Sequence, residues 1–245
     1  MSTSAQVPTR AERVDSMKSL IGLASTVLGG VLAVGMAGAA LAHSSAPPKE
    51  LRAVVNGVAD TPQGSLPHAF LNLDVWPDSL AGEHGDDGGP HPDWVSYGPS
   101  SNLVLPAHSL VTMTIKQYDT GEAITNPYFA QVHGTVDGTA TVDGHPVRAV
   151  DPETVGHTFT VHALITDQDP LFVSVPLPAV ADESPMLANG YAAPHVITFS
   201  FITGGAGDYV WQCEFPCGDG TYAKFGGPMS EQAYMAGTVR VEAKA

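Results

Sequence analysis

At 245 residues, with 43% hydrophobic and 14% charged residues, the chain can bury a full core, which excludes a disordered protein. Gly (26) and Pro (20) are abundant and aromatic residues make up only 7%, a balance that favours short strands joined by turns over a helical bundle. Three of the 10 basic and two of the 25 acidic residues precede residue 43, so residues 43–245 carry 7 basic and 23 acidic groups. This negative charge excludes nucleic acid as a partner and favours cationic partners, and it also keeps an exported protein soluble.

The N-terminal 42 residues have the pattern of a signal peptide or a single membrane anchor. Residues 20–42 contain no charge, follow a basic stretch and are just long enough to span a bilayer. They end in Ala40-Leu41-Ala42, a small-x-small pattern that signal peptidase accepts. Either interpretation predicts an extracytoplasmic protein that is secreted, periplasmic or anchored to the outer face of the cytoplasmic membrane. If residues 20–42 are not cleaved, they hold the chain in the membrane.

After a polar stretch expected to be a linker (43–65), residues 66–245 have the pattern of one strand-rich domain. Within residues 109–116, one parity carries Val111, Met113 and Ile115 and the other carries Thr112, Thr114 and Lys116, which is the period of a half-buried strand. The same alternation recurs at 197–201 and 238–242. Further strands are expected at 68–76, 135–142, 157–165, 171–175 and 208–213. About eight short strands with turns between them predict an all-β sandwich.

Two segments interrupt this rhythm. Residues 77–102 are rich in Gly and Pro and predict a long loop with the oxygen and imidazole donors Glu83, His84, Asp86, Asp87, His91 and Asp93. These donors could hold a divalent ion, but they have no ordered ligand spacing, and a solvated acidic loop explains them as well. Residues 134–151 contain the near-duplication TVDGTATVDG and predict a hairpin inserted between two strands of the sandwich.

The two cysteines of the chain, Cys213 and Cys217, are four positions apart. In an oxidising compartment an even pair often forms a disulfide, but one this local closes a tiny loop and stabilises little, so the pair suggests a chemical role. Cys213 ends a predicted strand and Met235 precedes the last one, and a Greek-key sandwich can bring two such residues to one end. His157 opens another strand and shares parity with Phe159, so its side chain should point toward the interior of that end.

The other histidines are less favoured as metal ligands. His162 has the opposite parity to His157 and should face away from the interior. His108 and His133 lie near predicted strand or loop ends and could reach the open end of the sandwich. His195 begins a strand and is interpreted as structural.

On these residues the sequence resembles the cupredoxins and is most similar to the copper domain of cytochrome c oxidase subunit II, over roughly residues 103–118 and 155–243. The resemblance implies a Greek-key β-sandwich with copper at one end, where the family uses a His, two thiolates that bridge two coppers, and a Met. The family's sequence motifs are matched by His157, Phe159, Cys213, Cys217, Gly218, Met235, Gly237, Val239 and Val241. Where the family has its second ligand His, this chain has Gln232, and residues 218–231 are an insertion in the ligand loop.

Three interpretations remain open. The first is a copper site of altered type, formed by His157, one or both thiolates and Met235, with Gln232 or another imidazole in the vacant position, in a protein that transfers electrons. The second is a metal-free scaffold in which Cys213 and Cys217 form a disulfide and the domain acts as an accessory or binding subunit. An enzyme is the least favoured, because no nucleophile-triad, paired-carboxylate or phosphate-loop pattern appears. An electron-transfer role would suit a basic cytochrome or a subunit of a respiratory complex as partner.

Overall fold

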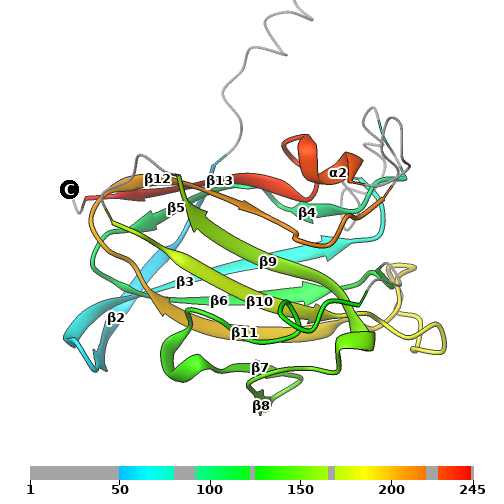
Figure 1. Ribbon diagram of the computed structural model, residues 1–245, viewed down its shortest axis with the longest axis horizontal. Helices are drawn as coiled ribbons and strands as arrows, with labels where there is room; N and C mark the ends of the chain where they lie inside the picture. The colour runs from blue at the N-terminus through cyan, green and yellow to red at the C-terminus, as the bar shows by residue number, and fades with distance from the viewer. Residues whose placement is uncertain are drawn as a thin grey trace, which may run out of the picture. The chain divides into compact units, whose positions relative to one another are not determined.

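The computed structural model describes residues 50–79, 91, 93–121, 125–164, 169–218 and 226–243. These residues form two β-sheets (Figure 1). The inward-facing side chains of the two sheets share one core. The prediction of an all-β, two-sheet sandwich is therefore confirmed. Among these residues we find no helix with the length and apolar character needed to cross a membrane. Residues 20–42, the expected signal peptide or anchor, lie outside the described part of the chain.

The first sheet, sheet A, has six strands in the order β1-β5-β13-β12-β9-β10. Their bounds are Glu50–Arg52 for β1, Asn102–Pro106 for β5, Ala236–Glu242 for β13, Gly207–Gln212 for β12, Val155–Ala163 for β9 and Phe172–Pro178 for β10. The strand β5 pairs in parallel with β1 and β13, and the remaining neighbours are antiparallel. The edge strand β10 lies beside β9, which carries His157.

The second sheet, sheet B, has the order β2-β3-β6-β11-β7-β8, and β4 pairs with β3. The bounds are Val54–Thr61 for β2, Gly64–Trp76 for β3, Ser96–Gly98 for β4, Leu110–Gln117 for β6, Ala140–Val142 for β7, His145–Val147 for β8 and His195–Ile202 for β11. Short helical segments are η2 (Val136–Gly138), η3 (Pro152–Thr154) and α2 (Gly227–Ser230). The hairpin of β7 and β8 lies between β6 and β9 in the chain, as the duplication predicted.

The core has the parity that the sequence pattern predicted. In β6 the apolar Val111, Met113 and Ile115 are fully buried, whereas the intervening threonines are only half-buried. From sheet A, Phe159 and Trp211 face them, and these two rings stack at a centroid distance of 5.2 Å. Burial of such large apolar side chains stabilises the sandwich before any metal is considered, at roughly 1.5–3 kcal/mol for a fully buried aliphatic or Phe side chain.

Three sequence expectations need correction in their described parts. The stretch 43–65, expected to be a linker, contains β1 and β2, because its backbone groups pair with β5 and β3 although many of its side chains stay exposed. The expected loop 77–102 contains β4, which pairs with the end of β3. The strand expected at 135–142 is shorter, since η2 occupies 136–138 and only 140–142 pair with a neighbouring strand.

Candidate metal centre

The register of sheet A brings His157 and Cys213 together. The strands β9 and β12 are antiparallel, and Gln212, the last residue of β12, pairs with Thr160 in the middle of β9. The next residue, Cys213, therefore continues toward Thr158, and its sulfur accepts a hydrogen bond from the Thr158 backbone N–H at 3.4 Å. Two segments more than 50 residues apart in sequence are joined here by strand pairing.

His157, Cys213 and Cys217 form one buried group whose ligand atoms all lie within 4.8 Å of one another. The Nδ1 atom of His157 is 2.9 Å from the Cys217 sulfur and 3.8 Å from the Cys213 sulfur. The histidine is 1% exposed and both cysteines are 0% exposed. His157 thus points into the interior, as its parity predicted.

The two cysteines are free thiols in this structure, with their sulfurs 3.2 Å apart. The loop between them is held tightly, because the Cys213 sulfur accepts the Phe215 N–H at 3.4 Å and the Phe215 carbonyl accepts the Cys217 N–H at 2.7 Å. The same carbonyl oxygen lies 3.0 Å from the Cys217 sulfur. A backbone oxygen donor is therefore present beside the sulfurs, at the second position after the first cysteine.

Asp119 completes the group and was missed by sequence reasoning. Its Oδ2 atom lies 2.6 Å from Nε2 of His157, on the opposite side of the imidazole ring from the sulfurs. The Gly121 N–H donates to the same oxygen at 2.9 Å, and the Gln117 amide donates to the Asp119 carbonyl at 3.1 Å. The only sequence signal is a polar residue just after an alternating strand, and that signal does not identify His157 as its partner.

The turn that carries Asp119 requires a glycine. Gly121 has φ +73°, and a Cβ at this position would lie 2.2 Å from the Cα of Gly156, the residue that precedes His157. A side chain would therefore push the turn away from the start of β9. The close approach of two glycine backbones lets the carboxylate reach the imidazole.

The charges of the group support one another. Burial lowers the pKa of His157, but its hydrogen bonds to Asp119 and Cys213 raise it from 6.5 to about 9. Burial raises the pKa of Asp119, yet the hydrogen bond to His157 holds it below its ordinary value. Burial likewise raises the pKa of Cys213, and hydrogen bonds with Cys217 and His157 bring it well below the ordinary value of a thiol. The arrangement favours a thiolate, the form of cysteine that binds metals.

The donor set fits a soft or borderline metal ion. Two sulfurs and an imidazole suit copper, and they also suit zinc. A hydrogen bond from the second ring nitrogen to a carboxylate is the usual support for a histidine that binds metal, because it orients the ring and leaves the other nitrogen for the ion. Here Asp119 supplies that support on Nε2, while Nδ1 faces the sulfurs.

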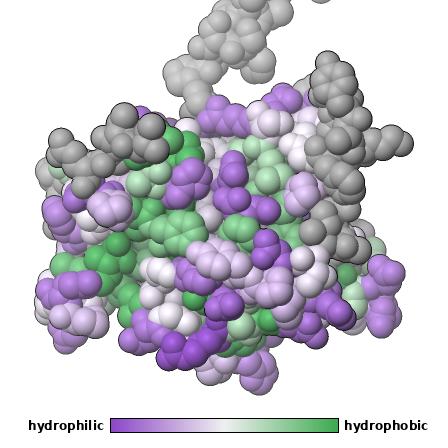
Figure 2. Space-filling model, in the orientation of Figure 1, coloured by the Kyte–Doolittle hydropathy of each residue, from purple (hydrophilic) through white to green (hydrophobic). Residues whose placement is uncertain are grey.

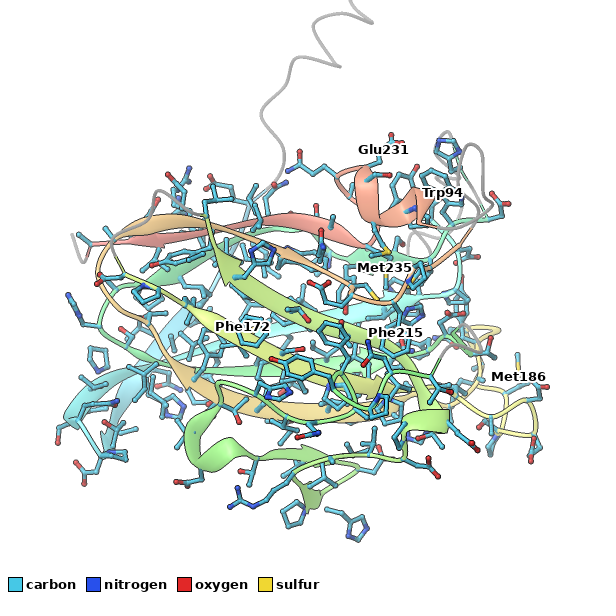
Figure 3. All side chains as sticks on the ribbon, viewed as in Figure 1. Trp94, Phe172, Met186, Phe215, Glu231 and Met235 are labelled. Atoms are coloured by element: carbon cyan, nitrogen blue, oxygen red, sulfur yellow. The ribbon has the colours of Figure 1, made fainter. Side chains whose placement is uncertain are left out.

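Of the remaining expected ligands, Met235 lies close to the group and Gln232 does not. Met235 is 0% exposed, belongs to the same core cluster as both cysteines, and its carbonyl accepts the Cys213 N–H at 2.9 Å (Figure 3). Gln232 is exposed, and its side-chain amide donates to Asn102 Oδ1 at the start of β5. The Gln232 amide, expected at the vacant ligand position, is therefore hydrogen-bonded to Asn102 instead.

The two segments expected as insertions meet over this end of the sandwich. His91 stacks on Trp94 at a centroid distance of 3.7 Å and lies 3.5 Å from Glu231, and Trp94 packs edge-on against Tyr234. A Cβ at Gly218 would lie 3.9 Å from Trp94, so this aromatic cluster lies next to the residue that follows Cys217. Of the other expected loop donors, Asp93 is exposed, and Glu83, His84, Asp86 and Asp87 lie outside the described residues.

The other histidines stay away from the group. His162 is half-buried on the face of β9 opposite to His157, and His195 pairs with Asp143 at 2.7 Å, in keeping with a structural role. His108 is exposed, and His133 stacks on Tyr128 at 4.4 Å. None of these four belongs to the buried metal-binding group found among the described residues.

No family model and no curated protein matches the chain. Among solved structures, auracyanin B is 14% identical, and the match covers 78% of this chain and 97% of that one with a TM-score of 0.33. The copper protein rusticyanin is 12% identical over 78% of this chain and 88% of its own, with a TM-score of 0.34. Rusticyanin from Thiobacillus ferrooxidans is 12% identical, and the match covers 78% of this chain and 87% of that one with a TM-score of 0.33. Because these scores are low, no property of either protein is transferred to this chain.

Proposed function

We propose that this chain is an exported cupredoxin-like protein that binds copper through His157, Cys213 and Cys217 and transfers electrons through that site. Met235 and the Phe215 carbonyl are the additional weak donors of the proposal. The cupredoxin-like assignment rests on the sequence resemblance. The copper site rests on the buried arrangement of the three side chains.

The observation that carries the proposal is the orientation of the His157 ring. Its Nε2 atom is 2.6 Å from Asp119, so the Nδ1 atom, 2.9 Å from the Cys217 sulfur, is the nitrogen available for a metal. Without a metal, Nδ1–H donates to the sulfur; after loss of that proton, the Nδ1 lone pair points at the same place. A buried imidazole and two buried sulfurs directed at one another form a preorganised ligand set.

The protein's own groups supply orientation and exclusion of water. Asp119 holds the imidazole, the Thr158 and Phe215 N–H groups hold the Cys213 sulfur, and the core around Trp211 keeps solvent out. Copper, when bound, supplies a one-electron couple. Because the donors are fixed by strand ends and by the hydrogen-bonded loop from Cys213 to Cys217, the site should rearrange little between its two oxidation states.

We further infer a single copper ion in each chain. The two-copper centre of the resembled family uses two imidazoles, whereas one imidazole lies in the buried group of this chain. Gln232, at the position of the second one, faces Asn102. A trigonal arrangement of one imidazole and two sulfurs with weak further donors suits one ion.

A copper titration of the reduced, purified chain tests the proposal. We expect an intense thiolate-to-copper absorption that saturates at one equivalent, with an electron paramagnetic resonance spectrum of a mononuclear centre. A matched sample in which the thiols have been oxidised should show neither signal. If the reduced chain has two titratable thiols and copper still produces no absorption, the copper site is wrong.

The second candidate function is a metal-free scaffold with a Cys213–Cys217 disulfide. The sulfurs are 3.2 Å apart, so the two cysteines need little movement to form the disulfide, and this separation favours the scaffold. In this case the purified protein should contain no titratable thiol before reduction, and its partner binding should not depend on copper. Thiol titration of protein isolated from the extracytoplasmic fraction separates the two candidates.

Export is an independent part of the proposal. It rests on the uncharged stretch 20–42 and the basic residues before it. Protease added to intact cells or spheroplasts should digest the strand-rich domain. A domain that is protected until the cells are lysed would contradict export while leaving the copper site untouched.

A further inference from the structure

Gln117 is the last residue of β6 and carries a polar side chain into the core. Val111, Met113 and Ile115 precede it with the same parity, and all four side chains are 0% exposed. Figure 2 shows hydrophilic residues spread over the visible face of the domain, where water satisfies their polar groups. An apolar residue at position 117 would continue the pattern of β6, so an amide at this inward-facing position requires an explanation.

The side-chain oxygen of Gln117 does not stabilise the fold. Within the described part of the chain, Oε1 is the one buried side-chain nitrogen or oxygen for which we find no hydrogen-bond partner. A buried acceptor without a partner lowers stability, because it has lost its hydrogen bonds to water. Any benefit of the amide must therefore come from its nitrogen.

The nitrogen of the amide holds the turn that carries Asp119. Nε2 of Gln117 donates to the Asp119 carbonyl at 3.1 Å, and the same carbonyl accepts the Val180 N–H at 3.0 Å. Val180 follows the end of β10 in sheet A by two residues, whereas Gln117 belongs to β6 in sheet B. The Asp119 carbonyl therefore accepts one hydrogen bond from the side of each sheet, which fixes the turn relative to both.

The Gln117 amide also lies against the start of β9. A Cβ at Gly156 would lie 3.2 Å from Gln117 Nε2, and a Cβ at Gly121 would lie 2.2 Å from the Gly156 Cα. The amide, the Asp119 turn and the residue before His157 are therefore closely packed. A shift of this turn would change the 2.6 Å contact between Asp119 Oδ2 and His157 Nε2, which orients the imidazole ring.

We propose that Gln117 is a positioning residue for the metal centre. Its amide holds the Asp119 turn, and through this turn it keeps the His157 ring in the orientation that directs Nδ1 at the two sulfurs. The inference rests on the proposed function for its purpose, but the positioning itself already exists in the metal-free chain. A positioning role predicts that loss of the amide disturbs the site without lowering the stability of the fold.

The test is Gln117→Leu in the reduced, metal-free full chain. Leucine is similar in size, removes the oxygen that has no partner, and leaves the Val180 N–H on the Asp119 carbonyl. We therefore expect a thermal midpoint at or above that of the wild type, measured by circular dichroism. The His157 Nε2–H proton, assigned in NMR spectra by its loss in His157→Gln, should exchange with water at least about tenfold faster, because its contact with Asp119 opens more often.

The second measurement on Gln117→Leu is copper affinity, by competition with a chelator. Loss of the hydrogen-bond partner of a ligating histidine lowers metal affinity by about 10–100-fold. We expect a decrease near the lower end of this range, because the variant displaces the Asp119 carboxylate without removing it. The absorption of the copper-loaded variant should also differ from that of the wild type, since the imidazole is held less firmly.

A matched control is Thr203→Val, which also replaces a buried polar side chain by an apolar one. Thr203 is 1% exposed, and its hydroxyl donates to the Pro106 carbonyl at 2.7 Å and accepts the Ser109 N–H at 3.0 Å. It follows the end of β11, whereas Gln117 pairs with His195 at the start of β11. The control should lower the thermal midpoint, because a buried N–H loses its partner, and should leave the His157 exchange rate and copper affinity unchanged.

The outcomes separate this inference from the proposed function. Unchanged His157 exchange in Gln117→Leu would overturn the positioning role, whatever the midpoint. Faster exchange together with a lower midpoint would overturn it in favour of a structural role, and so would wild-type copper affinity in the variant. If exchange is faster in a stable variant but neither protein binds copper, the positioning of His157 stands and the copper site fails.

Discussion

His157 and Cys213 lie at strand ends and Cys217 follows in the loop held by Phe215, and all three are at most 1% exposed. The segment 226–235, which contains α2 and the turn into β13, instead leaves Gln232 exposed against Asn102. The Ala233 N–H donates to Ser101 Oγ at 3.0 Å, so this turn is anchored at the start of β5. Donors at strand ends are placed by sheet register, which tolerates little change. The position of a donor on a turn depends on the hydrogen bonds that anchor the turn, and here Ser101 and Asn102 accept those bonds.

Replacing Cys217 by Ser should have the largest effect on this comparison. This change removes the sulfur closest to His157 Nδ1, so we expect the thiolate-to-copper absorption to weaken strongly. Loss of a hydrogen-bond partner of a ligand typically lowers metal affinity about 10–100-fold, and loss of the ligand itself should lower copper affinity by more than that. Titration with copper against a competing chelator measures this. Met229→Leu, which removes a sulfur from the turn, is the control and should leave the affinity unchanged. Equal losses in the two variants would show that the turn supplies the ligands.

Asp119→Asn should lower copper affinity by about 10–100-fold, because the amide is a weaker partner for the His157 ring. The matched control is Asp143→Asn, which changes a carboxylate that lies 2.7 Å from His195 on the surface. Only the Asp119 variant should affect the absorption spectrum and the affinity. If both variants bind copper as the wild type does, Asp119 has no positioning role.

The pH dependence of unfolding should reveal the charges of the metal-free group. The stabilising contribution of His157 is fully present below pH 6.5 and is lost as the pH rises through its folded pKa of about 9. Cys213, whose pKa is lowered, contributes fully above the ordinary pKa of a thiol, and that contribution is lost as the pH falls through the folded pKa. Between pH 6.5 and about 9, folding adds a proton to His157 and removes one from Cys213. These two changes cancel, so the wild-type free energy of unfolding should stay nearly constant in this range.

Cys213→Ser removes one of these two opposing contributions. The free energy of unfolding should then fall as the pH rises from neutral, with a slope of up to about 1.4 kcal/mol per pH unit while Asp119 still holds His157 protonated. Chemical denaturation at a series of pH values measures the slope in both proteins. A wild-type slope as steep as that of the variant would contradict the thiolate–imidazolium pair.

Gln232→His should have the smallest effect. Because Gln232 is exposed and bonds Asn102, an imidazole at this position should produce no gain in copper affinity, although the resembled family has a ligand His there. The measurement is the chelator competition used for the cysteine variants. A clear gain would show that the turn can reach the sulfurs in solution, and Gln232 would return to the proposed ligand set.

Sequence reasoning succeeded where a local pattern reports burial. The alternation in residues 109–116 predicted the inward side chains of β6, and the parity of His157 with Phe159 predicted its burial. It was less successful where backbone pairing decides. The residues of β1 and β2 have polar or exposed side chains and were assigned to a linker, yet their N–H and C=O groups complete the sheets. No period in their side chains reports this pairing.

By itself the sequence determined an all-β sandwich with an acidic surface and brought His157, Cys213 and Cys217 forward as one group, because side-chain period and residue chemistry are local properties. Only the tertiary structure decided that Asp119 supports His157 across 38 residues and that the two sulfurs lie beside its ring across 56 and 60. It also decided that Gln232 faces Asn102 across 130 residues. Such contacts depend on strand register and on the packing of turns. These are set by the whole fold and leave no mark at either residue alone.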